Sequence, residues 1–264
     1  MRTLLPLLIA LLAAPTSTVS SWQELAPGLD LGVFDSPTAS THGDSRVRVL
    51  RVDPARWEPV LLNGSALPGN PTLTARQWAE VEGLVAAINP SMYLADHRTS
   101  TALMRRPGHV NNPRRTKDND VLVFGGGKAT ILDAACDDLD AELPAWGTAI
   151  QSIRMLRCDG KNVWSQNKKR WSHAVVGLDG AGRLLLIHAR SPWTTHDFIE
   201  ILRKLPLDLK RLQYAEGGPE AQLYVHLGDT ELEQFGSYET GFYESDGNDR
   251  AWPVPNILGI RARP

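Results

Sequence analysis

Short runs of apolar residues, separated by turn residues, occupy most of the chain after residue 21. Six of them predict β-strands: residues 46–53, 58–62, 119–127, 171–179, 182–190 and 221–229. Within the fourth and fifth runs, residues 174–177 and 184–187 are continuously apolar, which is typical of strands buried on both faces. The pattern therefore predicts a sheet with these two strands near its centre.

Two segments show the spacing of amphipathic helices instead. The first begins after a cap at Thr74, carries Trp78, Val81 and Val85 on one face, and is expected to end at Asn89-Pro90. The second begins at Thr194 or Thr195, and its apolar face holds Phe198, Ile199, Leu202 and Leu205. We therefore predict an α+β fold: a mixed, largely antiparallel sheet with two main helices, in a single domain over residues 22–264.

The first 21 residues have a different pattern. Arg2 is followed by LLPLLIALLAA, an apolar run of signal-peptide length that is too short to span a bilayer. We predict that residues 1–21 are a cleaved signal peptide and that the mature chain begins near Trp22, with no membrane span. The protein is then exported, to a periplasmic or extracellular location.

Composition narrows the function classes only slightly. The 264 residues are 42% hydrophobic and carry a formal charge of −2, as in an ordinary globular protein. No basic excess favours a nucleic-acid partner. The long polar stretch at residues 107–120 predicts a loop, and long loops in compact domains are commonly functional or mobile.

Export changes the interpretation of the two cysteines, Cys136 and Cys158. Oxidising compartments favour disulfides, so we predict a structural bridge between them, with two free buried thiols as the alternative. Neither cysteine has a second cysteine or a histidine at ligand spacing, which argues against zinc.

Several catalytic and cofactor motifs fail. FGGGKATI, from Phe124, resembles a phosphate loop, but Leu122 and Ala129 stand where the motif needs Gly and Ser or Thr, so a glycine-rich hairpin is predicted. The acidic cluster of Asp133, Asp137, Asp138 and Asp140 does not follow the calcium-loop pattern. Gly-x-Ser-x-Gly and His-Glu-x-x-His do not occur. We expect no cofactor and no metal.

The stretch YAEGGPEAQLYV, residues 214–225, places Glu216 and Glu220 around Gly217-Gly218-Pro219. Gly-Gly-Pro is a common turn sequence, because glycine reaches positive φ and proline fixes φ near −65°. The stretch is therefore either a simple turn before a strand or a loop that presents a carboxylate to a substrate.

The order of several segments resembles the phosphodiester glycosidase family. The segments are WQELAPGLDLGVF, VRVLRVDPARW, AINPSMYLADHRTSTALMRRPG, AIQSIRML, WSHAVVGLDGAGRLLLIHAR, YAEGGPEAQLYV and VPNILGIRAR, which together span nearly all of residues 22–263. The resemblance implies an enzyme that removes a sugar from a phosphodiester, with a carbohydrate or glycan-phosphodiester substrate.

The family loop reads Asn-Leu-Asp-Gly-Gly-Gly-Ser-Ser at the position of the glutamate stretch. By this comparison Glu216 replaces the aspartate, Gly217 and Gly218 match two glycines, and Glu220 stands in place of a serine. A second departure is His173, which follows Ser172 where the family has Arg-Thr. Unlike arginine, histidine can be neutral at pH 7.

The resemblance assigns roles to these residues. Glu216 is the expected base or nucleophile, with Gly217 and Gly218 allowing close approach of a substrate and Glu220 beside it. Arg98 and His173 are candidates to hold the phosphate, and Asp96 and Asn89 to bind sugar hydroxyls. Gln151 and Ser152 are weaker candidates for the same pocket.

Structural alternatives stand beside three of these assignments. Asn89 before Pro90 also fits a helix stop, Asp96 an Asx turn, and Arg98 a solvated arginine. His188 alternates with apolar residues and is interpreted as a buried strand histidine.

The sequence thus predicts an exported glycosidase that hydrolyses a sugar-1-phosphodiester or a related glycan linkage. The competing hypothesis is a secreted carbohydrate-binding protein that keeps the fold without the activity, since both family motifs are altered. Hydrolysis of a different bond, such as one within a polysaccharide, is a third possibility.

Overall fold

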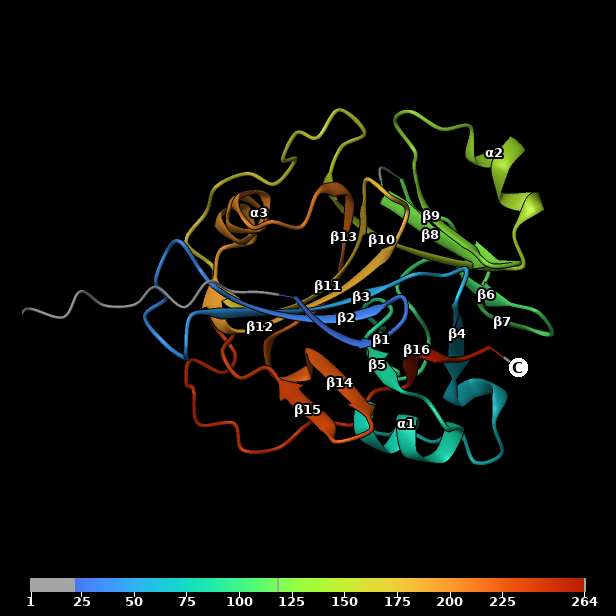
Figure 1. Cartoon of the computed structure of the whole chain (residues 1–264). Coiled ribbons are helices and arrows are strands. Elements are labelled where there is room, and N and C mark those ends of the chain that lie inside the picture. The colour runs from blue at the N-terminus through green and yellow to red at the C-terminus, as the bar shows by residue number, and fades with distance from the viewer. Residues whose placement is uncertain (1–21, 118, 264) are drawn as a thin grey trace, which may run out of the picture.

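The computed structural model describes residues 22–117 and 119–263. The predicted signal peptide, residues 1–21, lies outside the described residues. The described part contains two antiparallel sheets and three short α-helices, arranged in layers (Figure 1). The helices are α1 (Ala75–Glu82), α2 (Leu139–Glu142) and α3 (Thr195–Lys204).

The larger sheet has 11 strands in the order β1-β2-β3-β12-β11-β13-β10-β6-β7, with β8 pairing to β10 and β9 to β8. Its strands are β1 (Trp22–Ala26), β2 (Leu29–Asp35), β3 (Arg46–Val52), β6 (Met104–Arg106), β7 (His109–Asn112), β8 (Asn119–Gly125), β9 (Lys128–Asp133), β10 (Thr148–Leu156), β11 (Trp171–Asp179), β12 (Leu184–Trp193) and β13 (Leu209–Gly217).

The smaller sheet has 5 strands in the order β15-β14-β5-β16-β4. They are β4 (Trp57–Asn63), β5 (Ala86–Ile88), β14 (Gln222–Leu227), β15 (Thr230–Phe235) and β16 (Asn256–Ala262). Every strand pairing between the described residues is antiparallel in both sheets.

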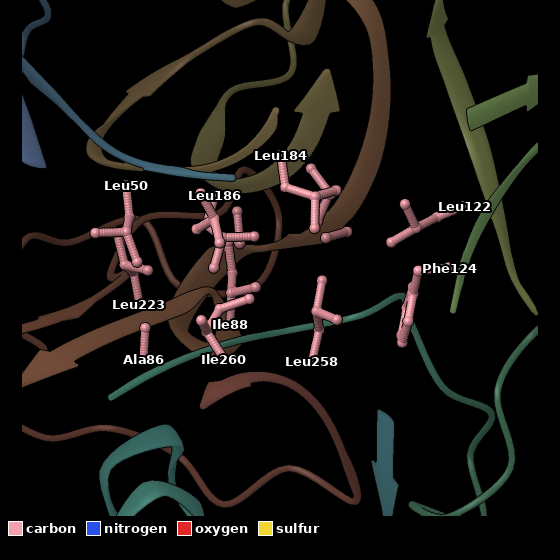
Figure 2. Close-up of a cluster of buried hydrophobic side chains, with 14 of the residues drawn as sticks. Leu50, Ala86, Ile88, Leu122, Phe124, Leu184, Leu186, Leu223, Leu258 and Ile260 are labelled. Atoms are coloured by element: carbon pink, nitrogen blue, oxygen red, sulfur yellow. The ribbon is translucent and has the colours of Figure 1, made fainter. Parts of the chain in front are cut away.

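Apolar side chains fill each space between the layers. Between the two sheets, residues such as Leu50 and Leu186 of the large sheet meet Ile88, Leu223 and Ile260 of the small one (Figure 2). Burial of such side chains contributes roughly 1.5–3 kcal/mol each. This core fixes the sheets against one another and gives their connecting loop a rigid base.

The helices cover the outer faces. Phe198 and Leu202 of α3 pack on Val175 and Ile187 of the large sheet. Trp78 of α1 packs with Tyr224 of β14. The order of layers is therefore α3, large sheet, small sheet and α1 (Figure 1).

The predicted α+β fold with a mixed sheet and two main helices is wrong, because the chain is mostly β and its sheets are antiparallel. One cause lies in the first helix. It begins where predicted, with a capping box between Thr74 and Gln77, but ends at Gly83, whose φ of 64° is left-handed. The residues expected to continue it, 86–88, form β5 in the small sheet.

Other sequence-based predictions hold. The second helix begins after its Thr194 cap, and the apolar runs at 174–177 and 184–187 are buried in paired central strands. Residues 107–120 are less loop-like than expected, because they include β7. A disulfide joins Cys136 and Cys158, so the alternative of two free thiols is wrong.

No helix within residues 22–117 and 119–263 is long and apolar enough to cross a membrane.

Candidate functional site

The glutamate stretch connects the two sheets. Glu216 and Gly217 end β13, a short 3-10 turn covers Gly218–Glu220, and β14 of the small sheet begins at Gln222. The chain thus changes sheets here, which requires a sharp turn; Gly218 supplies it with a φ of 64°. We call residues 216–221 the crossover loop.

Strand β13 is irregular just before the crossover loop. Tyr214 lies opposite Val175 of β11 and Glu216 lies opposite Ala174, so Ala215 is an extra residue in the pairing. Such bulges change the direction of nearby side chains. Tyr214 and Glu216 both line the same cavity.

The two glycines of the loop make room for neighbouring side chains. A Cβ on Gly217 would lie 2.0 Å from the Tyr214 hydroxyl, and one on Gly218 would lie 2.3 Å from Glu239 Oε2. Neither distance is sterically possible without movement. Because neither glycine has a side chain, the Tyr214 hydroxyl and the Glu239 carboxylate can lie against the loop.

A cavity of about 310 Å³ opens beside the crossover loop. Three carboxylates and three large aromatic side chains dominate its wall, which consists of Met92, Ile153, Trp164, Trp171, Tyr214, Glu216, Gly217, Glu220 and Glu239. We call it the glutamate cavity. No described residue in this wall is arginine, lysine or histidine. Concave, largely apolar sites with a few convergent polar groups are typical of ligand pockets.

Glu216 is nearly fully buried, and its Oε1 accepts one hydrogen bond, from the backbone N–H of Gly217 at 3.0 Å. Burial raises the pKa of this carboxyl to about 8, and the charges of Glu220 and Glu239 add to the effect. Glu216 therefore holds its proton at neutral pH, as a general acid must.

The other two carboxyls differ in their surroundings. Glu220 Oε1 accepts a hydrogen bond from the Tyr93 hydroxyl at 3.0 Å, which orients it. Burial raises the pKa of Glu239, and the Glu220 charge adds to the shift. The cavity thus brings a protonated glutamic acid close to further carboxyl groups, as acid–base catalysis requires.

The aromatic wall offers one further polar group. The rings of Trp164 and Tyr214 pack with centroids 5.7 Å apart. The indole Nε1 of Trp171 is buried and has no hydrogen-bond partner in the described part of the chain. An unsatisfied buried N–H is costly, so a hydrogen-bond acceptor that reached this group would be favoured.

Asn89 supports the crossover loop instead of lining the cavity. Its Nδ2 donates to the Glu220 carbonyl at 3.0 Å, and its Oδ1 accepts from the Gln222 N–H at 2.7 Å. The alternative of a helix stop is also wrong, since the helix ends at Gly83 and Asn89 follows β5. Asn89 acts as a clamp across the backbone that carries Glu220.

Asp96 and Arg98 lie in an exposed turn outside the cavity wall. Asp96 accepts hydrogen bonds from the backbone N–H of Arg98 and from both the N–H and hydroxyl of Thr99. The Asx-turn alternative is thus confirmed, and the Arg98 side chain is exposed.

His173 is fully buried on the side of the sheet covered by α3. Its ring stacks on Phe198 with centroids 4.4 Å apart, and its Nε2 lies 3.2 Å from the Thr195 hydroxyl. Burial lowers its pKa to about 3, so the ring is neutral at pH 7. Although His173 is paired with Gly217, it does not line the glutamate cavity.

The remaining candidates have structural contacts. Gln151 bonds the backbone of Thr116 through both side-chain atoms, and the Ser152 hydroxyl donates to the Tyr214 carbonyl. His188 is a buried strand histidine, as predicted, with its Nε2 3.2 Å from the Ala221 carbonyl.

Of the predicted site residues, the structure brings Glu216, Gly217 and Glu220 into one cavity. Sequence reasoning missed Glu239, Tyr214 and the two tryptophans. Trp164 and Trp171 enclose a polar run, which is a usable signal, since isolated aromatics beside polar loops often line sites. No residue pattern in the sequence around Glu239 indicates that it lines a site.

A comparison with families of known proteins gives one match. The family described as phosphodiester glycosidase matches residues 82–261. No match is found among curated proteins.

Two solved structures share the fold. The first is the zebrafish N-acetylglucosamine-1-phosphodiester alpha-N-acetylglucosaminidase catalytic domain auto-inhibited by pro-peptide; it superposes with a TM-score of 0.62 and 14% identity, over 92% of this chain and 87% of that one. The second is a hypothetical protein from Synechocystis, with a TM-score of 0.62 and 11% identity, over 94% of this chain and 64% of that one.

Proposed function

Because the chain belongs to the phosphodiester glycosidase family, and is thus a hydrolase of the glycosidase type, we propose that it cleaves a glycan linkage in the glutamate cavity with Glu216 as a catalytic carboxyl group. The observation that carries the proposal is the meeting of Glu216, Glu220 and Glu239 in one aromatic-walled cavity. Glycosidases use two carboxyl groups, one as acid and one as base or nucleophile.

The roles follow from the environment of each group. Glu216 enters the reaction protonated, since burial raises its pKa to about 8, and it protonates the leaving oxygen. A second carboxylate, from Glu220 or Glu239, activates water or attacks the anomeric carbon. The aromatic rings pack against the apolar faces of the sugar, and the Trp171 indole N–H donates to a hydroxyl.

The cavity favours a linkage between neutral sugars over a sugar-1-phosphodiester. Three carboxyls and no described cation in the wall leave a phosphate without a counter-charge. Phosphate is also a good leaving group that needs little protonation, whereas a sugar alkoxide needs a proton from a general acid as it leaves. A glutamic acid that is protonated at neutral pH suits the second task.

The substrate is tested by incubating purified protein with a GlcNAc-1-phosphodiester and with a panel of neutral 4-nitrophenyl glycosides and glycan oligosaccharides. We expect release of reducing sugar from a neutral glycoside. Turnover of the phosphodiester alone would contradict the preference for a neutral linkage. It would still agree with the proposal that the protein is a glycosidase.

The role of Glu216 is tested by Glu216→Gln, which keeps the side-chain shape and removes the acid. We expect turnover of a glycan oligosaccharide, whose leaving group is a sugar alkoxide, to fall by about 10²–10⁴-fold, because a general acid contributes that much. Glu24→Gln, at an exposed glutamate on β1, is the matched control and should retain activity. Binding of a glycan by a parent protein that cleaves none of the panel would favour the non-catalytic alternative.

We further propose that the protein acts outside the cytoplasm as one domain over residues 22–264. The apolar run after Arg2 supports export. Mass measurement of the protein from its native host tests the idea, and intact Met1 would contradict it.

A further inference from the structure

A second cavity, of about 340 Å³, lies where the small sheet ends. Its floor is the edge strand β4, and the ends of β6 and β8 and the start of β10 face it from the large sheet (Figure 1). It shares no lining residue with the glutamate cavity. We call it the arginine cavity, after Arg106, Arg261 and Arg263 in its wall.

Arg106 lies in β6, Arg261 lies in β16 and Arg263 follows β16 directly; the cavity wall that they share has a single acidic residue. Glu58 is that residue, and it is already paired with Arg261 at 2.6 Å. No described carboxylate forms an ion pair with Arg106 or Arg263. Among residues 22–117 and 119–263, the two guanidinium charges of Arg106 and Arg263 therefore have no carboxylate partner.

Each of these two guanidinium groups also has one N–H donor without a described hydrogen-bond partner. Arg263 Nη2 donates to the Pro54 carbonyl and Arg106 Nη1 to the Pro107 carbonyl. The Nε of each arginine is buried and has no hydrogen-bond partner among residues 22–117 and 119–263. Buried donors without partners are costly, so each of these guanidinium groups would be stabilised by a further hydrogen-bond acceptor.

The glycine-rich hairpin between β8 and β9 completes the wall. Gly125 and Gly126 line the cavity, and a Cβ on either would meet no atom within 4 Å. Gly127 lies against Arg263, whose Nη2 would be 3.7 Å from a Cβ there. The hairpin does not follow the nucleotide phosphate-loop pattern, but it leaves open space directly beside the guanidinium groups.

From this arrangement we infer that the arginine cavity binds a tetrahedral oxyanion, a phosphate or sulfate group, held mainly by Arg106 and Arg263. Guanidinium groups match such oxygens in geometry and charge. The group is either a free anion or an ester on a sugar. The site is separate from the glutamate cavity, so it retains an anionic ligand without placing a negative charge among the three glutamates.

Isothermal titration calorimetry at low ionic strength tests the inference with two probes, inorganic phosphate and glucose 6-phosphate. We expect saturable binding of at least one of them. Preference for the ester identifies a phosphorylated sugar as the ligand, and equal affinity identifies the free anion. No saturable heat with either probe at millimolar concentration overturns the site.

Variants locate the binding. Arg106→Gln and Arg263→Gln should each weaken it by about tenfold, since a charge-assisted hydrogen bond is lost. Glu58→Gln should tighten it, because Arg261 is released from its partner. Circular dichroism and thermal melting establish that each variant is folded. If Arg106→Gln does not fold, the binding measurement on Arg263→Gln tests the site.

The matched control is Arg170→Gln, at an exposed arginine next to Trp171 of the glutamate cavity. Binding should be unchanged in this variant. If Arg170→Gln abolishes binding and Arg106→Gln does not, the anion binds at the glutamate cavity and the inference fails. The assay measures binding without turnover, so it is independent of the glycosidase proposal.

Discussion

Three neighbours shift the pKa of the Glu216 carboxyl group, one downward and two upward. One backbone N–H stabilises its charged form, while burial and the charges of Glu220 and Glu239 oppose it more strongly. The net result is a carboxyl group that titrates near pH 8 instead of near 4.5.

This titration predicts the pH dependence of the enzyme. If Glu216 is the acid, kcat/KM for a neutral glycoside should fall tenfold per pH unit above about pH 8, where the group loses its proton. A pH–rate profile measured on the best substrate of the panel checks it. Activity that stays level to pH 10 would assign the acid to another group.

The sequence pointed to Glu216 and Glu220 through a local pattern, a carboxylate beside two glycines before a strand, and through the family resemblance, and both residues line the glutamate cavity. It did not identify Glu239, because that residue reaches the cavity only through the folding of a distant loop. Nor did it show that His173, which lies beside Trp171 and Tyr214, would be buried against Phe198 instead of lining the cavity, because that packing depends on the distant helix α3.

At the scale of elements, the crossover loop depends on glycines for two separate reasons. Gly218 needs a positive φ and also lies against the Glu239 carboxylate. Gly83, which ends α1, has the same φ of 64°, but a Cβ added there would meet no atom within 4 Å. A substitution at Gly83 therefore introduces backbone strain alone, whereas the same substitution at Gly218 introduces both strain and crowding.

We expect Gly83→Ala and Gly218→Ala each to lower the free energy of unfolding by roughly 1–2 kcal/mol, from left-handed strain. Only Gly218→Ala should also displace Glu239 and reduce kcat/KM by at least about tenfold, because small displacements of catalytic groups are costly. Urea unfolding and kinetics on both variants check this. Equal activity in the two would show that Glu239 is not needed.

Sequence reasoning missed both long and short strands: β10 and β13, with 9 residues each, were not predicted, and neither were several very short strands. Residues 86–88, 104–106 and 109–112 have three or four residues each and are too short to show alternation. They form because partners from elsewhere in the chain accept their hydrogen bonds. The strands β11 and β12, with their continuous apolar runs, and the capped helices α1 and α3 were found, because their signals are local.

At the scale of the whole molecule, the disulfide joins two distant chain segments. It connects the loop after β9 to the loop after β10, with a sequence separation of 22. Asp133 braces the same region, since its Oδ2 accepts from the Cys158 N–H at 2.7 Å and its Oδ1 pairs with Arg154.

Replacing both cysteines by serine should therefore lower the free energy of unfolding by about 3 kcal/mol, the chain-entropy value for a loop of this length. Denaturant unfolding of the parent and of the double variant checks the figure. Treatment of the parent with a reducing agent should give the same loss. A difference below about 0.5 kcal/mol, the usual effect of a surface substitution, would show that Asp133 alone holds the region.

The two sheets are also linked by a histidine. His188 of β12 contacts the Ala221 carbonyl at the end of the crossover loop, and burial, with the Arg48 charge, lowers its pKa to about 3. The unfolded chain, with a histidine pKa near 6.5, binds more protons between these values. The stabilisation is complete above about pH 6.5 and is lost as the pH falls toward 3.

We expect the Tm of the parent to fall steeply from about pH 7 to about pH 4, and that of His188→Gln to fall less steeply, since glutamine cannot take up a proton. Thermal melting across this range checks the slope. His226→Gln, at an exposed histidine of β14, is the control. Parallel curves for parent and His188→Gln would contradict the assignment.

The pairing of β3 with β12 has a kinetic consequence. These strands are neighbours in the large sheet although β4 to β11 lie between them in sequence. Folds dominated by such distant pairings fold slowly, because long loops must close before the contacts stabilise them. The walls of the glutamate cavity come from separate stretches between residues 92 and 239, so the cavity closes only after those pairings exist. Recovery of activity after dilution from denaturant should therefore lag behind recovery of strand content.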